Sequence, residues 1–80
     1  MLKGNVIAIN VEKSYLEFKD ENSIKIKVDF DKKALDVLKD KGVNPLFDKL
    51  FKLSIVKLTY TTPSGKTREI NNFITIEPVE

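Results

Sequence analysis

Residues 24–30 of the chain read Ile-Lys-Ile-Lys-Val-Asp-Phe, so that every second residue is apolar and the others are charged. This period of two is typical of a β-strand with one buried and one solvated face. A helix would spread the same apolar residues around its whole circumference. Residues 15–18 (Tyr-Leu-Glu-Phe) alternate in the same way, and the polar residues 19–23 join the two runs. The stretch from Tyr15 to Phe30 therefore predicts a β-hairpin.

A further strand is predicted on the N-terminal side of this hairpin. Residues 4–12 are apolar on much of both faces, with Ile7, Ile9 and Val11 on one face and Val6 and Ala8 on the other. A strand of this kind is covered on both sides or bends around a core, as barrel strands do.

Two strands are predicted at the C-terminal end of the chain. Residues 53–61 place Val56, Leu58 and Tyr60 on one face, and the turn at 62–65 leads to a return strand over 66–77. Phe73 is out of register with the other apolar residues of this return strand. Either a bulge at Asn71-Asn72 reverses the phase, or Phe73 lies on the outer face.

The connection between the two halves is predicted to be helical over about residues 32–52. Asp31 is a suitable N-cap and Gly42 a suitable terminator for a first helix over residues 32–41. Asn44-Pro45 is a second start signal, and it precedes an apolar stripe that predicts a short second helix. The stripe consists of Leu46, Phe47, Leu50 and Phe51.

Composition limits the classes of function. The 80 residues carry a net charge of +2 and include no cysteine and no histidine, so we expect no metal site and no cofactor. No spacing suggests a nucleophile with its base, so we do not expect an enzyme. The longest apolar run, residues 6–9, is far below the roughly 18 residues that cross a bilayer. We therefore expect one cytoplasmic domain over residues 1–80, with no membrane association.

The order strand-strand-strand-helix-strand-strand resembles that of the OB-fold, a five-stranded barrel found in many oligonucleotide-binding domains. The local pattern of residues 4–9, 15–20 and 23–28 also resembles the first three strands of such domains. The fold class expected is therefore β-rich α+β, with a small antiparallel five-stranded barrel. An SH3-like barrel is the alternative topology.

The resemblance implies a binding surface on the outer face of the second and third strands and on the loop between the last two. Positive charge supports this, because no acid lies between Asp48 and Glu69. We therefore expect low-specificity binding of single-stranded nucleic acid by cations beside aromatic rings. The candidate residues are Tyr15, Lys25, Lys27, Lys57, Lys66, Arg68 and Phe73.

The alternative function is a protein-interaction module or a homodimeric structural domain with no nucleic-acid role. Marginally stable small domains gain stability by association. The candidate contacts for a protein partner or for self-association are Leu46, Phe47, Leu50, Phe51 and Phe73. The nucleic-acid candidates also have a purely structural interpretation: Tyr15 as a cross-strand packing residue, Lys25 and Lys27 as solvated strand residues, and Phe73 as part of the core. The basic segment that contains Lys57, Lys66 and Arg68 has the alternative of a solvated, lysine-rich surface.

Overall fold

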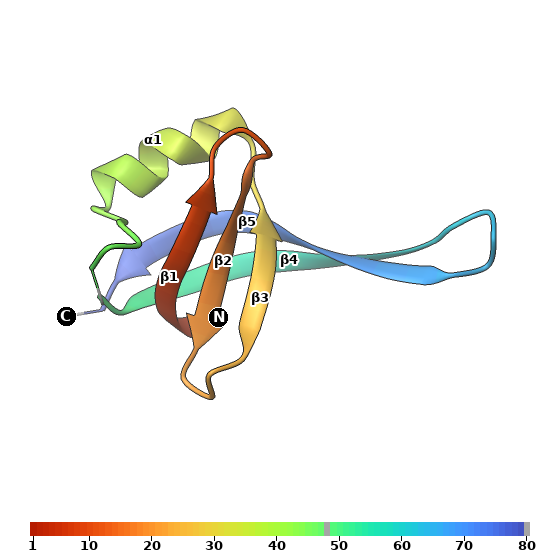
Figure 1. The fold of residues 1–80 in the computed structure, drawn as a ribbon, viewed down its shortest axis with the longest axis horizontal. Helices are drawn as coiled ribbons and strands as arrows, with labels where there is room; N and C mark the ends of the chain where they lie inside the picture. The colour runs from red at the N-terminus through yellow and green to blue at the C-terminus, as the bar shows by residue number, and fades with distance from the viewer. Residues whose placement is uncertain (48, 80) are drawn as a thin grey trace.

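The computed structural model describes residues 1–47 and 49–79, and it shows five strands that close into a barrel (Figure 1). The strands are β1 (Leu2–Asn10), β2 (Tyr15–Asp20), β3 (Lys25–Asp29), β4 (Phe51–Thr61) and β5 (Thr67–Pro78). Within the described ranges, one helix, α1 (Lys32–Asp40), joins β3 to β4. The predicted order of elements and the five-stranded barrel are thus confirmed. No described helix is long and apolar enough to span a membrane.

The sheet is mixed, whereas the sequence predicted an antiparallel one. Its strand order is β1-β2-β3-β5-β4, with β4 pairing back to β1 to close the barrel. Four of the pairings are antiparallel, but β3 and β5 are parallel at Asp29 and Asn72. Parallel neighbours need a crossover connection, and here α1 and β4 supply it. This order is compatible with an OB-like small barrel.

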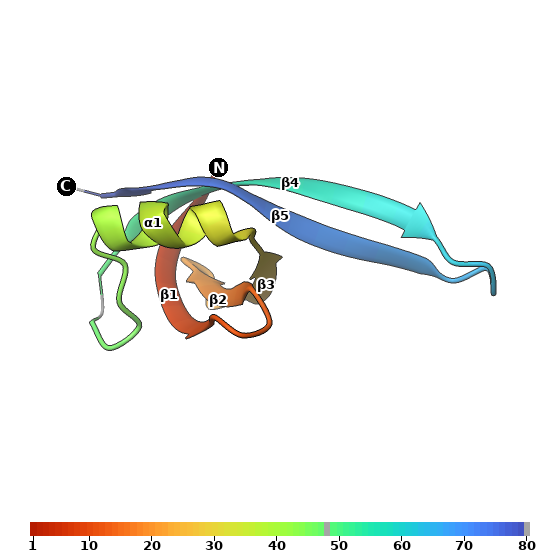
Figure 2. The same ribbon diagram turned by 90° about the horizontal axis from the view of Figure 1, so that it is seen from above.

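The barrel interior is filled from all five strands and from α1. The hairpin residues Leu16, Phe18, Val28 and Phe30 are buried, as their alternation predicted, but Ile24, predicted to face inward with them, precedes β3 and is exposed. The helix covers one end of the barrel and contributes two buried side chains (Figure 2). The remaining buried apolar residues are Val6, Ala34, Leu38, Phe51, Leu53 and Ile76.

The helix α1 begins and ends where the sequence predicted, to within one residue. The Asp31 carboxylate accepts a hydrogen bond from the Ala34 amide at 3.1 Å, which makes Asp31 the N-cap. After the helix, Gly42 adopts a positive φ of 70°. The amide of Val43 then donates to the Leu38 carbonyl at 2.9 Å, which completes a glycine-based C-cap.

A bulge in β1 changes which of its residues face the core. The register with β2 shifts between Val6 and Ala8, so Val6 pairs with Phe18 and Ile9 pairs with Leu16. Val6 and Ile9 therefore face inward together, although strict alternation placed them on opposite faces. The predicted shared face of Ile7, Ile9 and Val11 was wrong because of this bulge, and because Val11 lies beyond the end of β1.

The predicted second helix is not seen in the described residues 44–47 and 49–52. The Asn44 side chain accepts from the Leu46 amide at 2.9 Å, and the Asn44 carbonyl accepts from the Phe47 amide at 3.0 Å. These bonds make a local turn after Pro45 that is not propagated. Phe51 is instead the first residue of β4 and is buried in the barrel. Asp48 lies outside the described residues.

A second bulge lies in β5 and explains Phe73. The register of β4 with β5 shifts so that Ser54 pairs with Thr75 and Ile55 with Phe73, which leaves Ile74 as the extra residue. Phe73 and Ile55 pack against the core, and Ile74 is exposed. The phase reversal therefore occurs at Ile74 and not at Asn71-Asn72.

The strands β4 and β5 extend well beyond the barrel. From the Ile55–Phe73 pair to the turn at residues 62–66 they remain paired with each other, and both views show them projecting as a two-stranded arm (Figures 1 and 2). We call residues 56–72 the arm. The turn is closed by hydrogen bonds from the Thr62 amide to the Lys66 carbonyl at 2.8 Å and from the Gly65 amide to the Thr62 carbonyl at 2.9 Å.

Candidate nucleic-acid interface

The outer surface of β2 and β3 carries a group of polar side chains. Because Leu16, Phe18 and Val28 face the core, the residues that alternate with them face outward. The antiparallel register places these outward residues in three facing pairs. We call this set the lysine face; its pairs are Lys19 with Lys25, Glu17 with Lys27, and Tyr15 with Asp29.

Two lysines lie directly opposite each other on this face. Facing residues on neighbouring antiparallel strands have Cβ atoms about 5 Å apart, and like charges in such a pair are destabilising. The Lys19–Lys25 pair is of this kind. Among the described residues the ion pairs are Lys3–Glu21, Lys41–Glu77 and Lys57–Glu69, and none of them neutralises a cation of the lysine face. An anion placed between the two ammonium groups would relieve this repulsion.

An aromatic ring lies beside the third lysine of this face, Lys27. The Lys27 ammonium lies over the Tyr15 ring, 4.7 Å from its centroid. This is a cation–π contact, and it places a positive charge above the half-buried Tyr15 ring at the edge of the face. The carboxylates Glu17 and Asp29 share the same surface, so the face holds three lysines and two acids.

The predicted candidates on the arm are not gathered in the same way. Lys57 forms an ion pair with Glu69, with 3.8 Å between the charged atoms. Arg68 faces Tyr60 in the ladder and so lies on the opposite face of the arm from Lys57. Lys66 lies at the turn. Phe73 packs against the core. Of the seven candidates, the structure brings together Tyr15, Lys25 and Lys27.

The arm has one polar and one apolar face. Ile55 and Phe73 point toward the core at the base of the arm. Farther along the arm, the same face of the two strands is polar and includes Lys57, Thr59, Glu69 and Asn71. The other face, which we call the apolar arm face, is formed by Val56, Leu58, Tyr60, Arg68, Ile70 and Asn72. Its three apolar β4 side chains are 42%, 47% and 45% exposed.

One side chain joins the arm to β3. The Asn71 amide nitrogen donates to the Lys27 carbonyl at 3.2 Å, whereas its side-chain oxygen is buried without a partner. This bond lies beside the parallel Asp29–Asn72 pair. It therefore extends the junction at which the barrel closes and the arm begins.

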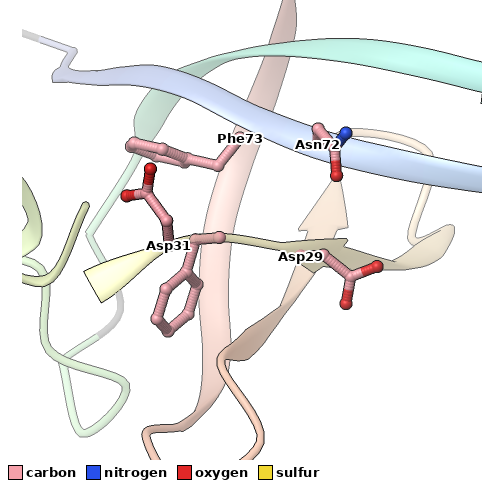
Figure 3. A pocket seen from close by; sticks show the side chains of 5 residues that line it. Asp29, Asp31, Asn72 and Phe73 are labelled. Atoms are coloured by element: carbon pink, nitrogen blue, oxygen red, sulfur yellow. The ribbon is translucent and has the colours of Figure 1, made fainter. Parts of the chain in front are cut away.

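A hollow of about 410 Å³ opens at this junction (Figure 3). Its lining residues are Asp29, Phe30, Asp31, Asn72 and Phe73, so it presents two carboxylates and no basic side chain among the described residues. The Asp31 carboxylate already caps α1, whereas Asp29 belongs to the lysine face. No cluster of three or more metal-ligating side chains occurs in residues 1–47 and 49–79.

The predicted partner stripe is divided by the structure. Leu46, Phe47 and Leu50 are exposed on the connection between α1 and β4, and Phe51 is buried. The exposed members of the stripe are therefore Leu46, Phe47 and Leu50, whereas Phe73 packs against the core. Leu46 and Phe47 are the most exposed of them, at 87% and 67%.

Sequence reasoning missed one residue of the lysine face, and it placed Val56, Leu58 and Tyr60 on one face of a strand without predicting that this face is exposed. Lys19 was assigned to a polar turn, but β2 continues to Asp20 and Lys19 pairs with both Asn5 and Lys25. The available signal was the alternation Tyr15, Glu17, Lys19. Comparison of the chain with protein-family models, with curated proteins and with solved structures found no match.

Proposed function

We propose that this protein binds single-stranded nucleic acid on the lysine face. The observation that carries the proposal is the Lys19–Lys25 pair, two cations held opposite each other with Lys27 and an aromatic ring alongside. Phosphates of a flexible strand would lie between the ammonium groups, and a base would stack on Tyr15. The outer face of the second and third strands is also where OB-fold domains bind oligonucleotides.

The arrangement favours weak binding with little sequence preference. Lysine is a point charge that neutralises phosphate without reading a base, and every base has a face that can stack on tyrosine. With about three phosphates neutralised, the logarithm of the affinity would fall with the logarithm of salt with a slope of about −2 for single strands. Glu17 and Asp29 would oppose the ligand and limit the affinity further.

The proposal rests on the lysine face alone and not on the arm. Lys57 forms an ion pair with Glu69, and Arg68 lies on the other face of the arm. These cations therefore do not form one continuous positive surface with the lysine face. Titration with both DNA and RNA oligonucleotides distinguishes the two kinds of nucleic acid.

Titration of a labelled oligonucleotide at two ionic strengths tests the proposal. Lys25→Gln should weaken binding about three- to tenfold at low salt and reduce the salt slope by about 0.7. Glu17→Gln should strengthen binding, because it removes a carboxylate from the same face. Lys33→Gln is the matched control, since Lys33 is an exposed lysine on α1.

Three results would contradict the proposal. The first is no binding of any oligonucleotide at low salt, and the second is binding that is indifferent to salt. The third is an equal loss of affinity in Lys33→Gln and Lys25→Gln, because it would mean that overall charge and not the lysine face attracts the ligand.

A further inference from the structure

The arm presents an apolar surface with no second layer. Two paired strands alone are marginally stable in water and need a layer packed on their apolar face. On the apolar arm face, Val56, Leu58 and Tyr60 alternate along β4, and Ile70 lies opposite Leu58. The three β4 side chains remain nearly half exposed. A contiguous apolar surface on an extended ribbon marks a docking site.

Charge is distributed unevenly along this face. Arg68 lies near the tip, opposite Tyr60, and it is the one charged residue among the six that form the face. Asn72 lies at the base, where its partner across the parallel pairing is Asp29. With the Asp29 carboxylate of β3 beside its base, the apolar arm face therefore runs from an acidic neighbour, through an apolar middle, to a positive tip. A surface of this kind is complementary to itself when two copies are arranged antiparallel.

We infer that the apolar arm face docks against the same face of a second copy of this chain, with the two arms antiparallel about a two-fold axis. The axis would pass by the Leu58–Ile70 pair, which lies midway between Arg68 and Asn72 on the ladder. Strand residues rise about 3.4 Å each, so Arg68 and Asn72 each lie about 7 Å from Ile70, on opposite sides. The symmetry then places each Arg68 over the partner's Asn72 and beside the partner's Asp29.

The hollow at the base of the arm fits this arrangement. Asp29 and Asn72 line it together with Asp31, and its described lining residues include no cation. A guanidinium that enters from the partner would lie between carboxylate oxygens and an amide oxygen, which are the acceptors that arginine prefers. On β4, at the same distance from the axis, Tyr60 of each copy would cover the partner's Val56. Asp29 also belongs to the lysine face, but neither contact uses Lys19, Lys25 or Lys27, the cations on which the proposed function rests.

The expected dimer is weak because the interface is small. Stable interfaces bury about 800 Å² and 20–30 residues on each side, and the apolar arm face with Asp29 supplies seven. Sedimentation equilibrium across the micromolar range should therefore show a concentration-dependent monomer–dimer equilibrium. Leu58→Lys should raise the dissociation constant by about tenfold or more, because it buries an unpaired charge at the axis. Leu46→Lys is the control, since it changes an equally apolar exposed residue away from the arm.

A charge exchange tests the register. Arg68→Asp alone would place a new carboxylate against the partner's Asp29, and Asp29→Arg alone would place two arginines together, so each variant should be monomeric. When the two variants are mixed, both ion pairs re-form in the heterodimer and association should return. Circular dichroism of each variant shows that its fold is retained.

Each remaining outcome overturns the inference. A chain that stays monomeric throughout the micromolar range has no such dimer. If Leu46→Lys dissociates the dimer and Leu58→Lys does not, the exposed connection between α1 and β4 is the interface instead. Failure of the mixed variants to associate would rule out the antiparallel register, even if Leu58→Lys had weakened the wild-type dimer.

Discussion

The strands β4 and β5 belong to both the barrel and the arm, and their two ends can be compared directly. In the barrel Leu53 pairs with Ile76, and both side chains are fully buried. In the arm Leu58 pairs with Ile70 in the same antiparallel ladder, but Leu58 is about half exposed. The residue types and the backbone pairing are alike. The difference is that the barrel provides a second layer and the arm does not.

This comparison indicates what each part contributes to stability. Burial from water, and not the ladder itself, supplies most of the favourable free energy of an apolar strand residue. The barrel should therefore unfold in one cooperative step, whereas the arm should open locally at a lower free energy. Substitutions in the barrel should lower the free energy of global unfolding much more than equivalent substitutions in the arm.

The largest effect is expected at Gly4, where β1 is paired with both β2 and β4. A Cβ at this position would overlap the carbonyl oxygen of Lys19 and would lie 2.8 Å from the Asp20 Cα. Both are backbone atoms, so the β1–β2 ladder would have to open. Gly4→Ala should cost at least about 3 kcal/mol of the free energy of unfolding, measured in urea.

Asn5→Ala is the matched control for Gly4→Ala, because Asn5 is the next residue of β1 and faces outward opposite Lys19. Its effect should stay within about 0.5 kcal/mol. If Gly4→Ala lowered the free energy of unfolding no more than Asn5→Ala, the β1–β2 ladder would accommodate the added Cβ at little cost. The barrel would then be no more rigid than the arm.

The next largest effect is expected at Leu53, which we compare with Leu58 in the same strand, β4. Leu53→Ala removes a fully buried side chain and should cost about 3 kcal/mol of the free energy of unfolding. Leu58→Ala should cost less than about 1 kcal/mol, because its side chain is about half exposed. Both are measured in urea at a protein concentration low enough to keep the chain monomeric. Equal losses would mean that the arm is packed against something in the monomer.

The elements that local chemistry determines were predictable. The alternation over residues 24–30 predicts a strand with one solvated face without reference to any other strand. Asp31 and Gly42 each act within a single turn at the two ends of α1. The candidate residues Tyr15, Lys25 and Lys27 lie together because they belong to one hairpin, whose register follows from its own alternation.

Features that depend on distant strands were not predictable. The bulges at Ile7 and Ile74 arise because β1 and β5 must each match two neighbours around a closed barrel. Lys19 is in a strand because β1 pairs with it, and Phe51 is in a strand because β1 and β5 pair with it. Alternation along β4 predicted a strand, but it contains no information on whether a second layer covers Leu58.

The smallest effect separates the two regions most sharply. Gly42 and Gly65 both have positive φ, 70° and 83°, and an added Cβ would meet no atom within 4 Å at either position. Alanine should therefore cost the same backbone strain at both, about 1 kcal/mol. Gly42 ends α1, whose Ala34 and Leu38 are in the core, so Gly42→Ala should lower the free energy of global unfolding by that amount.

Gly65 instead closes the turn of the arm, where its amide donates to the Thr62 carbonyl. If the arm opens before the barrel unfolds, the strain in Gly65→Ala raises the population of the open arm and leaves the global midpoint in urea nearly unchanged. The effect should appear as faster hydrogen exchange of the Thr62 and Gly65 amides, by about fivefold for 1 kcal/mol. An equal shift of the global midpoint in both variants would show that arm and barrel unfold together, and the contrast between covered and uncovered ends of one ladder would then have no energetic consequence.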